Sequence, residues 1–188
     1  MQRNHALPLV LAAAAVAIVA ACTTAPPKPV AKLNDGELAI PADYKSWPKF
    51  LTAVQRPDAK QVRDVYVIPG ADRTKAGDPF PDGTVFVMEN YAAKANADGS
   101  LVTAGDGKLV KGDLLRVFVM GKGEGFADKT IPELRNGTWV YAAYDAAGKP
   151  APDPTANCRA CHLPQANKDF VHRYDEYFSS RPVIRSGY

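Results

Sequence analysis

The chain has 188 residues, of which 46% are hydrophobic and 23% are charged, and its formal net charge is +3. A chain of this length can form one domain with a real hydrophobic core. The small net charge gives no argument for nucleic-acid binding, and the sequence contains no internal repeat and no phosphate-binding glycine loop.

The first 21 residues are typical of a secretory signal peptide. A single basic residue, Arg3, precedes an apolar run that ends in small residues at Ala21. The letters "VAAC", which end at Cys22, also match a bacterial lipobox. We therefore expect cleavage before Cys22 and a diacylglyceryl group on its sulfur, with simple secretion as the alternative. Residues 1–21 are assigned to the lipoprotein signal peptide.

The segment after the signal peptide is expected to be a tether. Residues 22–36 contain three prolines and little that could pack, which suits an extended connection between lipid and domain. Residues 37–188 are expected to form the domain itself. These assignments predict a lipoprotein anchored on the periplasmic side of a membrane. Thr23, which stands in place of aspartate after the lipidated cysteine, favours the outer membrane.

The central part of the chain predicts a short helix followed by an antiparallel sheet. In "SWPKFLTAV", residues 46–54, apolar side chains recur at the spacing of an amphipathic helix. Four segments then alternate at the period of a strand, and connections rich in Gly, Asp, Asn and Pro separate them. Short strands joined in this way favour an antiparallel sheet. The four segments are residues 62–68, 84–91, 113–120 and 138–145.

A further helix is predicted after the sheet, within "NKDFVHRYDEYFSSRP", where Pro182 ends the pattern. The predicted fold class is therefore α+β, a mostly antiparallel β-sheet with flanking helices. A haem with a large apolar face would pack against one face of that sheet. The helical stripe consists of Phe170, Val171, Tyr174, Tyr177 and Phe178.

The clearest chemical signal is "CRACH", residues 158–162. In an extracytoplasmic protein this spacing is the signature of covalent haem attachment, in which Cys158 and Cys161 form thioethers and His162 binds the iron. A redox dithiol would require a βαβ unit, which the strand pattern does not show, and zinc would require further Cys or His ligands. The remaining cysteine, Cys22, is expected to carry lipid. The sequence thus predicts one covalent haem c.

The candidate ligands for the sixth iron position are Met88, Met120, His172 and several lysines. A methionine ligand is typical of an electron carrier with a raised potential. Core packing is the ordinary role of a strand methionine, and a solvated surface position is the ordinary role of His172 on the polar side of the last helix.

Two arginines, Arg63 and Arg116, interrupt otherwise apolar strands. A half-buried arginine favours an anionic partner, which a haem propionate would supply, and exposure at a sheet edge is the alternative. Phe118 shares a strand face with Arg116 and Met120.

The order of these motifs resembles the cytochrome P-460 family. The resemblance runs from about Leu38 to Phe178, and it rests on "FPDGTVFVMENY", "NGTWVYAAYDAAGKP", "CRACH" and "DFVHRY". It implies a mostly antiparallel sheet with flanking helices and one c-type haem held by Cys158, Cys161 and His162.

The resemblance also implies two branches that differ at the distal face of the haem. In the hydroxylamine-oxidising branch, a strand lysine cross-links to the porphyrin and a distal carboxylate assists proton removal. Met88 stands at the lysine position here, and Phe118 stands at the carboxylate position. The other branch, similar to cytochrome c′-beta, has five-coordinate iron beneath aromatic side chains. Phe118, with Phe86 or Phe80 as a second ring, fits that arrangement.

Three hypotheses for function follow from these residues. The favoured one is binding of a small gas such as nitric oxide at five-coordinate haem, because aromatic and apolar side chains replace the catalytic ones. The second is electron transfer to a redox partner protein, with Met88 or Met120 as sixth ligand. The third is oxidation of hydroxylamine or a related small nitrogen compound, which needs a base that the predicted distal face lacks. A homodimer is compatible with all three.

Overall fold

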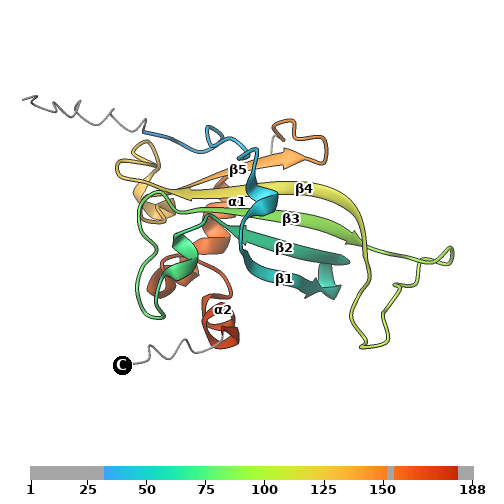
Figure 1. Ribbon diagram of the computed structural model, residues 1–188. Coiled ribbons are helices and arrows are strands. Elements are labelled where there is room, and N and C mark those ends of the chain that lie inside the picture. The colour runs from blue at the N-terminus through green and yellow to red at the C-terminus, as the bar shows by residue number, and fades with distance from the viewer. Residues whose placement is uncertain (1–31, 152–154, 182–188) are drawn as a thin grey trace, which may run out of the picture. The chain divides into compact units, whose positions relative to one another are not determined.

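A five-stranded antiparallel sheet forms the centre of the computed structural model, which describes residues 32–151 and 155–181 (Figure 1). Each strand pairs with the next one along the chain, so the sheet is a meander with the order β1-β2-β3-β4-β5. The predicted α+β fold and the four predicted strands β2 to β5 are confirmed. The strands are β1 (Lys49–Arg56), β2 (Gln61–Val67), β3 (Val85–Ala93), β4 (Lys111–Lys122) and β5 (Trp139–Asp145).

Two short α-helices follow the sheet, α1 (Thr155–His162) and α2 (Tyr174–Ser180). The connection between β3 and β4 forms a long hairpin, which Figure 1 shows extending past the sheet. Within the described ranges no helix is long and apolar enough to cross a membrane. The remaining helical turns are η1 (Tyr44–Ser46), η2 (Pro57–Ala59), η3 (Ala71–Arg73), η4 (Pro132–Leu134) and η5 (Leu163–Lys168).

The predicted signal peptide, Cys22 and residues 22–31 of the predicted tether lie outside the described residues. Residues 32–36, which the sequence also assigned to the tether, contact the domain. The N–H of Gly36 donates to the carbonyl of Tyr141 at 2.8 Å, and the N–H of Tyr141 donates to Asp35 Oδ1 at 3.1 Å. The last residues before the predicted domain therefore run along β5.

Apolar side chains cover both faces of the sheet, because successive strand residues point to opposite sides. One group, which we call the helix-side core, packs against Cys158 of α1 and includes side chains of α2. The other group, the N-terminal-side core, lies under Leu38 and Ile40. The helix-side core consists of Phe50, Val67, Ala71, Phe80, Phe86, Met120, Trp139, Tyr141, Val171, Tyr174 and Tyr177. The N-terminal-side core consists of Tyr44, Trp47, Tyr66, Val87, Val117, Val119, Ala142 and Tyr144.

The helix predicted over residues 46–54 is wrong. The chain forms the turn η1 and then strand β1, in which Ala53 adopts a left-handed φ of 52° at an irregularity of the register. Trp47 belongs to the N-terminal-side core, whereas Phe50 belongs to the helix-side core. Val54, four residues after Phe50, is buried as well. The apolar residues of a bulged strand, together with Trp47 before it, therefore imitated the spacing of a helix.

The predicted last helix begins later than its apolar stripe. Asp169, Phe170 and Arg173 have φ values of 51°, 60° and 57°, which no right-handed helix contains. The helix α2 therefore starts at Tyr174, and residues 169–173 form a loop between η5 and α2. The stripe still faces the helix-side core, because Val171 and the α2 tyrosines are buried there.

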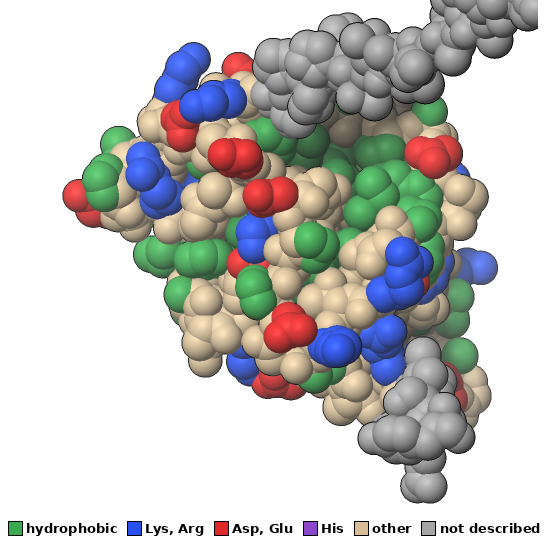
Figure 2. All heavy atoms as spheres, turned by 60° about the vertical axis from the view of Figure 1, so that its left-hand side comes forward, with side chains coloured by type: hydrophobic (Ala, Val, Ile, Leu, Met, Phe, Trp, Pro, Cys, Tyr) green, Lys and Arg blue, Asp and Glu red, His purple; other side chains and the backbone are tan. Residues whose placement is uncertain are grey.

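Acidic and basic side chains are interspersed over the face drawn in Figure 2. This mixture agrees with the small formal net charge of +3. Because positive and negative charges are interspersed, neither sign dominates the electrostatic potential over this face.

A buried carboxylate organises the sheet face opposite the helices. Glu89 is 2% exposed and accepts hydrogen bonds from the hydroxyls of Tyr44 (2.8 Å), Tyr66 (3.0 Å) and Tyr91 (2.7 Å). Burial alone would raise the pKa of Glu89, but the three phenol hydroxyls and Lys45 outweigh it and lower that pKa. Glu89 is therefore held ionised at neutral pH.

We expect Glu89→Gln to lower the free energy of unfolding by about 1–3 kcal/mol at neutral pH, because an amide cannot accept from all three hydroxyls. The folded pKa is lowered, so the ionised group stabilises the fold above its unfolded pKa of about 4.3. This contribution disappears as the pH falls through the folded value. Urea unfolding at several pH values measures it: the gap between the two proteins should narrow below about pH 4, and a constant gap would contradict this account.

Candidate functional site

A cavity of about 300 Å³ opens on the helix-side face of the sheet. All five strands contribute to its walls, together with α1 and the loop before α2. Most of the lining side chains are apolar, and the cationic ones are Arg56, Arg63 and Arg173. The six residues predicted as cofactor-binding all line this cavity, namely Cys158, Cys161, His162, Phe118, Met88 and Arg63.

The helix α1 presents both thiols and the imidazole on one side. Cys158 and Cys161 are three positions apart, and His162 is four positions after Cys158, so the three side chains share a helix face. That face looks into the cavity. The sequence spacing alone gives this arrangement once the segment is helical.

His162 is held in an orientation suited to a metal ligand. Its Nδ1 lies 2.7 Å from the carbonyl oxygen of Phe170, and its ring centroid lies 5.1 Å from that of Tyr141. A carbonyl only accepts, so Nδ1 carries the hydrogen and the lone pair is on Nε2. Burial lowers the pKa of His162 to about 4, against the opposing effect of the Phe170 carbonyl. The imidazole is therefore neutral at neutral pH, as a metal ligand must be.

The residue that follows Cys158 anchors α1 to the rest of the domain. Arg159 is 2% exposed, and its guanidinium donates to both carboxylate oxygens of Asp35 at 2.6 and 2.7 Å. It also donates to the carbonyl of Trp139 at 3.1 Å. In return, the Asn136 side-chain amide donates to the carbonyl of Arg159 at 3.1 Å. Sequence reasoning missed this anchor, because no local pattern relates Asp35 to Arg159.

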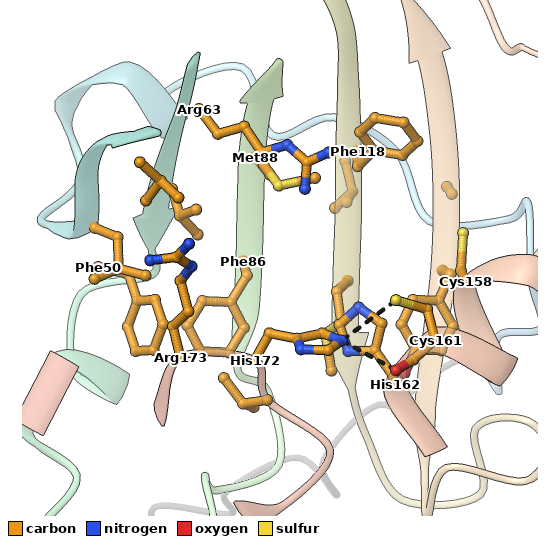
Figure 3. Close-up of a pocket in the computed structure, with 18 of the residues that line it drawn as sticks. Phe50, Arg63, Phe86, Met88, Phe118, Cys158, Cys161, His162, His172 and Arg173 are labelled. Atoms are coloured by element: carbon orange, nitrogen blue, oxygen red, sulfur yellow. Dashed lines mark hydrogen bonds between the residues drawn. The ribbon is translucent and has the colours of Figure 1, made fainter. Parts of the chain in front are cut away.

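Met88 and Phe118 lie directly opposite each other on β3 and β4. Figure 3 shows these two side chains with Arg63 at one end of the pocket, and His162, His172 and Cys161 at the other. Met88 and Phe118 are both half-buried. Met120 also lines the cavity and is 8% exposed. The cavity wall beyond the imidazole is thus sulfur, aromatic and aliphatic.

Of the two candidates for a second distal ring, Phe86 lines the cavity and Phe80 does not. Phe80 packs edge-on against Phe86, with ring centroids 5.1 Å apart, and is 1% exposed. Its role is therefore packing within the helix-side core.

Arg63 faces the pocket with neutral partners. Its guanidinium donates to Asn90 Oδ1 at 3.0 Å and to Gln61 Oε1 at 2.9 Å, and the ion pairs found among the described residues do not include it. Burial is the main cause that lowers its pKa. By contrast, Arg116 is exposed. Arg63 is therefore the better placed of the two to meet a buried anion.

The sequence predicted that His172 lies on the surface of the last helix, and this prediction is wrong. His172 precedes α2 and lines the cavity, where its ring centroid lies 4.7 Å from that of His162. Its Nε2 lies 3.0 Å from the Cys161 carbonyl oxygen and 3.4 Å from Cys161 Sγ, the contacts drawn dashed in Figure 3. His172 thus packs beside the imidazole of His162, on the side of the cavity that carries the thiols.

The two alternative interpretations of the cysteines lack the structure that they require. Every strand pair is antiparallel, so the described residues contain no βαβ unit of the thioredoxin type. Within the same residues, no group of three or more His, Cys, Asp or Glu side chains could hold a metal ion. The thiols and the imidazole instead line an apolar cavity.

These residues fit a covalently attached haem. The cavity is apolar, as a porphyrin face requires, and Nε2 of His162 makes no hydrogen bond to the described residues. The buried hydroxyl of Tyr141, also at the cavity, has no hydrogen-bond partner among them either. A comparison with family profiles matches residues 41–173 to Cytochrome P460. A comparison with curated proteins finds no match.

Proposed function

The chain belongs to the cytochrome P460 family, and we propose that it binds a small neutral gas, nitric oxide being the example, at haem iron held on the protein side by His162 alone. Haem c, the cofactor of this family, supplies an iron whose ferrous form binds such gases. The observation that carries the proposal is the composition of the pocket. Among its described lining residues there is no carboxylate and no lysine.

Each part of the pocket has a role in this proposal. Cys158 and Cys161 form the two thioethers, and His162 Nε2 is the axial ligand. Phe118 and Met88 occlude the opposite side and exclude water, while leaving room for a diatomic molecule. Arg63 pairs with a propionate, which gives the half-buried guanidinium an anionic partner.

The pocket composition speaks against oxidation of hydroxylamine. That chemistry needs a general base within hydrogen-bond reach of the substrate. The position expected for a carboxylate holds Phe118, and the position expected for the cross-linking lysine holds Met88. Lys94, the lysine nearest to Met88 in the sequence, is exposed and follows the end of β3.

Electron transfer is the second candidate, and one observation favours it. Met88 is half-buried and lines the cavity beside Phe118, so its sulfur lies at the pocket and not only in the core. A sixth ligand from Met88 would give low-spin iron with a raised potential.

We further propose that this function is exercised at a periplasmic membrane surface. The support is the sequence pattern of residues 1–36, with Cys22 as the lipidated first residue of the mature chain. The outer membrane is favoured by Thr23. A redox partner and a homodimer are compatible with this placement.

One preparation tests the proposal. Protein purified from cells that make c-type cytochromes should keep a peroxidase-staining band after denaturing electrophoresis, and Cys158→Ala with Cys161→Ala should abolish that stain. The ferrous protein should show a five-coordinate high-spin spectrum and bind nitric oxide. A wild-type band without peroxidase stain would refute covalent haem attachment. A low-spin ferrous spectrum without added ligand would instead favour electron transfer over gas binding.

A further inference from the structure

The loop between η5 and α2 holds two consecutive non-glycine residues in a left-handed conformation. Asp169 has φ 51° and Phe170 has φ 60°. This conformation is unfavourable for an L-residue, so it persists only where surrounding contacts impose it. The carbonyl that this loop offers to His162 Nδ1, at 2.7 Å, is that of Phe170. The strained segment is thus the one that orients the imidazole.

The Asp169 carboxylate ties this loop to the sheet. Lys122, the last residue of β4, donates to both of its oxygens at 2.9 Å. The backbone N–H of Phe80 donates to Oδ2 at 2.8 Å, and the indole N–H of Trp139 points at Oδ1 from 3.4 Å. The Lys122 and Asp169 side chains are only 15% and 12% exposed. A buried pair with these additional donors fixes its partners more firmly than an exposed pair does.

Local hydrogen bonds shape the loop but do not place it. The N–H of Phe170 donates to the carbonyl of Gln165, and the N–H of Val171 donates to that of Lys168. Both bonds stay within residues 165–171, so they would survive a shift of the whole loop. The bonds of Asp169 cross to β4 and β5, and they therefore set where the Phe170 carbonyl lies.

Both partners of the His162 hydrogen bond are anchored at the start of β5. The helix that carries His162 is held there through Arg159 and the carbonyl of Trp139, at 3.1 Å. The loop that carries the Phe170 carbonyl approaches the same residue through Asp169 and the Trp139 indole. The distance between imidazole and carbonyl is therefore fixed by two connections to one residue.

We propose that Asp169 is a positioning residue for His162: through the Phe170 carbonyl it sets how strongly Nδ1–H is hydrogen-bonded, and so how basic Nε2 is as an iron ligand. A stronger hydrogen bond to an imidazole ligand raises its basicity and favours the ferric state. The inference rests on the proposed ligation by His162. Under this inference, a carboxylate outside the cavity influences both the reduction potential and the strength of the iron–imidazole bond.

Asp169→Asn tests the inference, because it keeps the shape of the side chain but loses the charge that faces Lys122. In the ferrous protein we expect a lower iron–imidazole stretching frequency by resonance Raman spectroscopy. We also expect a higher reduction potential, since the loosened carbonyl leaves Nε2 less basic. Asp169→Glu, which restores the carboxylate, should return both values part of the way to those of the wild type.

Asp64→Asn is the matched control. Asp64 is 4% exposed and also binds lysines, Lys49 at 3.2 Å and Lys111, and it accepts from the N–H of Ala53 at 2.8 Å. It points to the opposite face of the sheet, so its loss should reduce stability without moving either spectroscopic value. Unchanged values in folded, haem-loaded Asp169→Asn would overturn the inference. A ferrous wild-type protein without any iron–imidazole band would instead refute five-coordinate iron bound by His162, on which the proposed function depends.

Discussion

Asp35→Ala should lower the free energy of unfolding by about 3–5 kcal/mol, because it leaves the Arg159 guanidinium buried without its counter-charge. Arg159 is 2% exposed, and Asp35 supplies two short charge-assisted hydrogen bonds to it. The carbonyl of Trp139 would remain as a partner, but a neutral acceptor cannot compensate a buried cation. This loss falls on the helix that carries the three residues proposed to attach haem.

Urea unfolding of the purified protein, followed by circular dichroism, measures this effect. Asp128→Ala is the matched control, because Asp128 forms an ion pair with Lys32 at 3.1 Å near the same N-terminal segment. Those two side chains are 58% and 69% exposed, so their pair should contribute less than about 1 kcal/mol. An Asp35 variant no less stable than the Asp128 variant would show that Arg159 finds another partner. The helix α1 would then be held in place without the contact from Asp35.

The strands β2 to β5 could be predicted because each has two faces of different composition or a continuous apolar run. On β3, Phe86 and Met88 face the cavity, while Val87 and Glu89 point to the other side. Such alternation can be recognised in the sequence without knowledge of the partner strands. β1 could not be predicted in this way, since Phe50, Leu51 and Val54 all line the cavity and Ala53 interrupts the alternation.

The grouping of Cys158, Cys161 and His162 could be predicted for a similar reason, because they are neighbours in one helix. The contacts that hold this helix could not. Asp35 and Arg159 are separated by 124 positions, and Lys122 and Asp169 by 47. His172 was misplaced because the helical stripe around it includes Phe170, whose backbone is left-handed. Helical spacing of apolar residues does not report the sign of φ.

The wall opposite His162 decides between the proposed functions. Met88 and Phe118 are a directly opposed pair on adjacent strands, so they form one continuous surface on the cavity. If Phe118 covers the iron, no side chain occupies the sixth position and ligand entry is limited by the ring. If the sulfur of Met88 reaches the iron, the same surface supplies a ligand instead. Substitutions at these two positions therefore have opposite consequences under the two proposals.

Phe118→Ala should open the site to water and raise the rate of nitric oxide binding to ferrous protein, by about tenfold if the ring adds 1.4 kcal/mol to the barrier. Removal of the ring leaves more than the roughly 10–15 Å³ that one water molecule needs. The ferric protein should then show a water-bound spectrum that the wild type lacks. Because Phe118 is half-buried, the cost in stability should be below the about 3–5 kcal/mol of a fully buried phenylalanine. Stopped-flow mixing and ferric absorption spectra measure the two effects.

Met88→Leu is the companion experiment, since it nearly conserves volume and removes only the sulfur. Under gas binding, the spectrum of the variant should match that of the wild type in both oxidation states, and the binding rate should change little. Under electron transfer, the wild type should be low-spin, and Met88→Leu should convert it to high-spin with a lower reduction potential, because a thioether ligand favours ferrous iron. That conversion would identify Met88 as the axial ligand. The Phe118 ring would then pack against a coordinated methionine and would not guard an open coordination position.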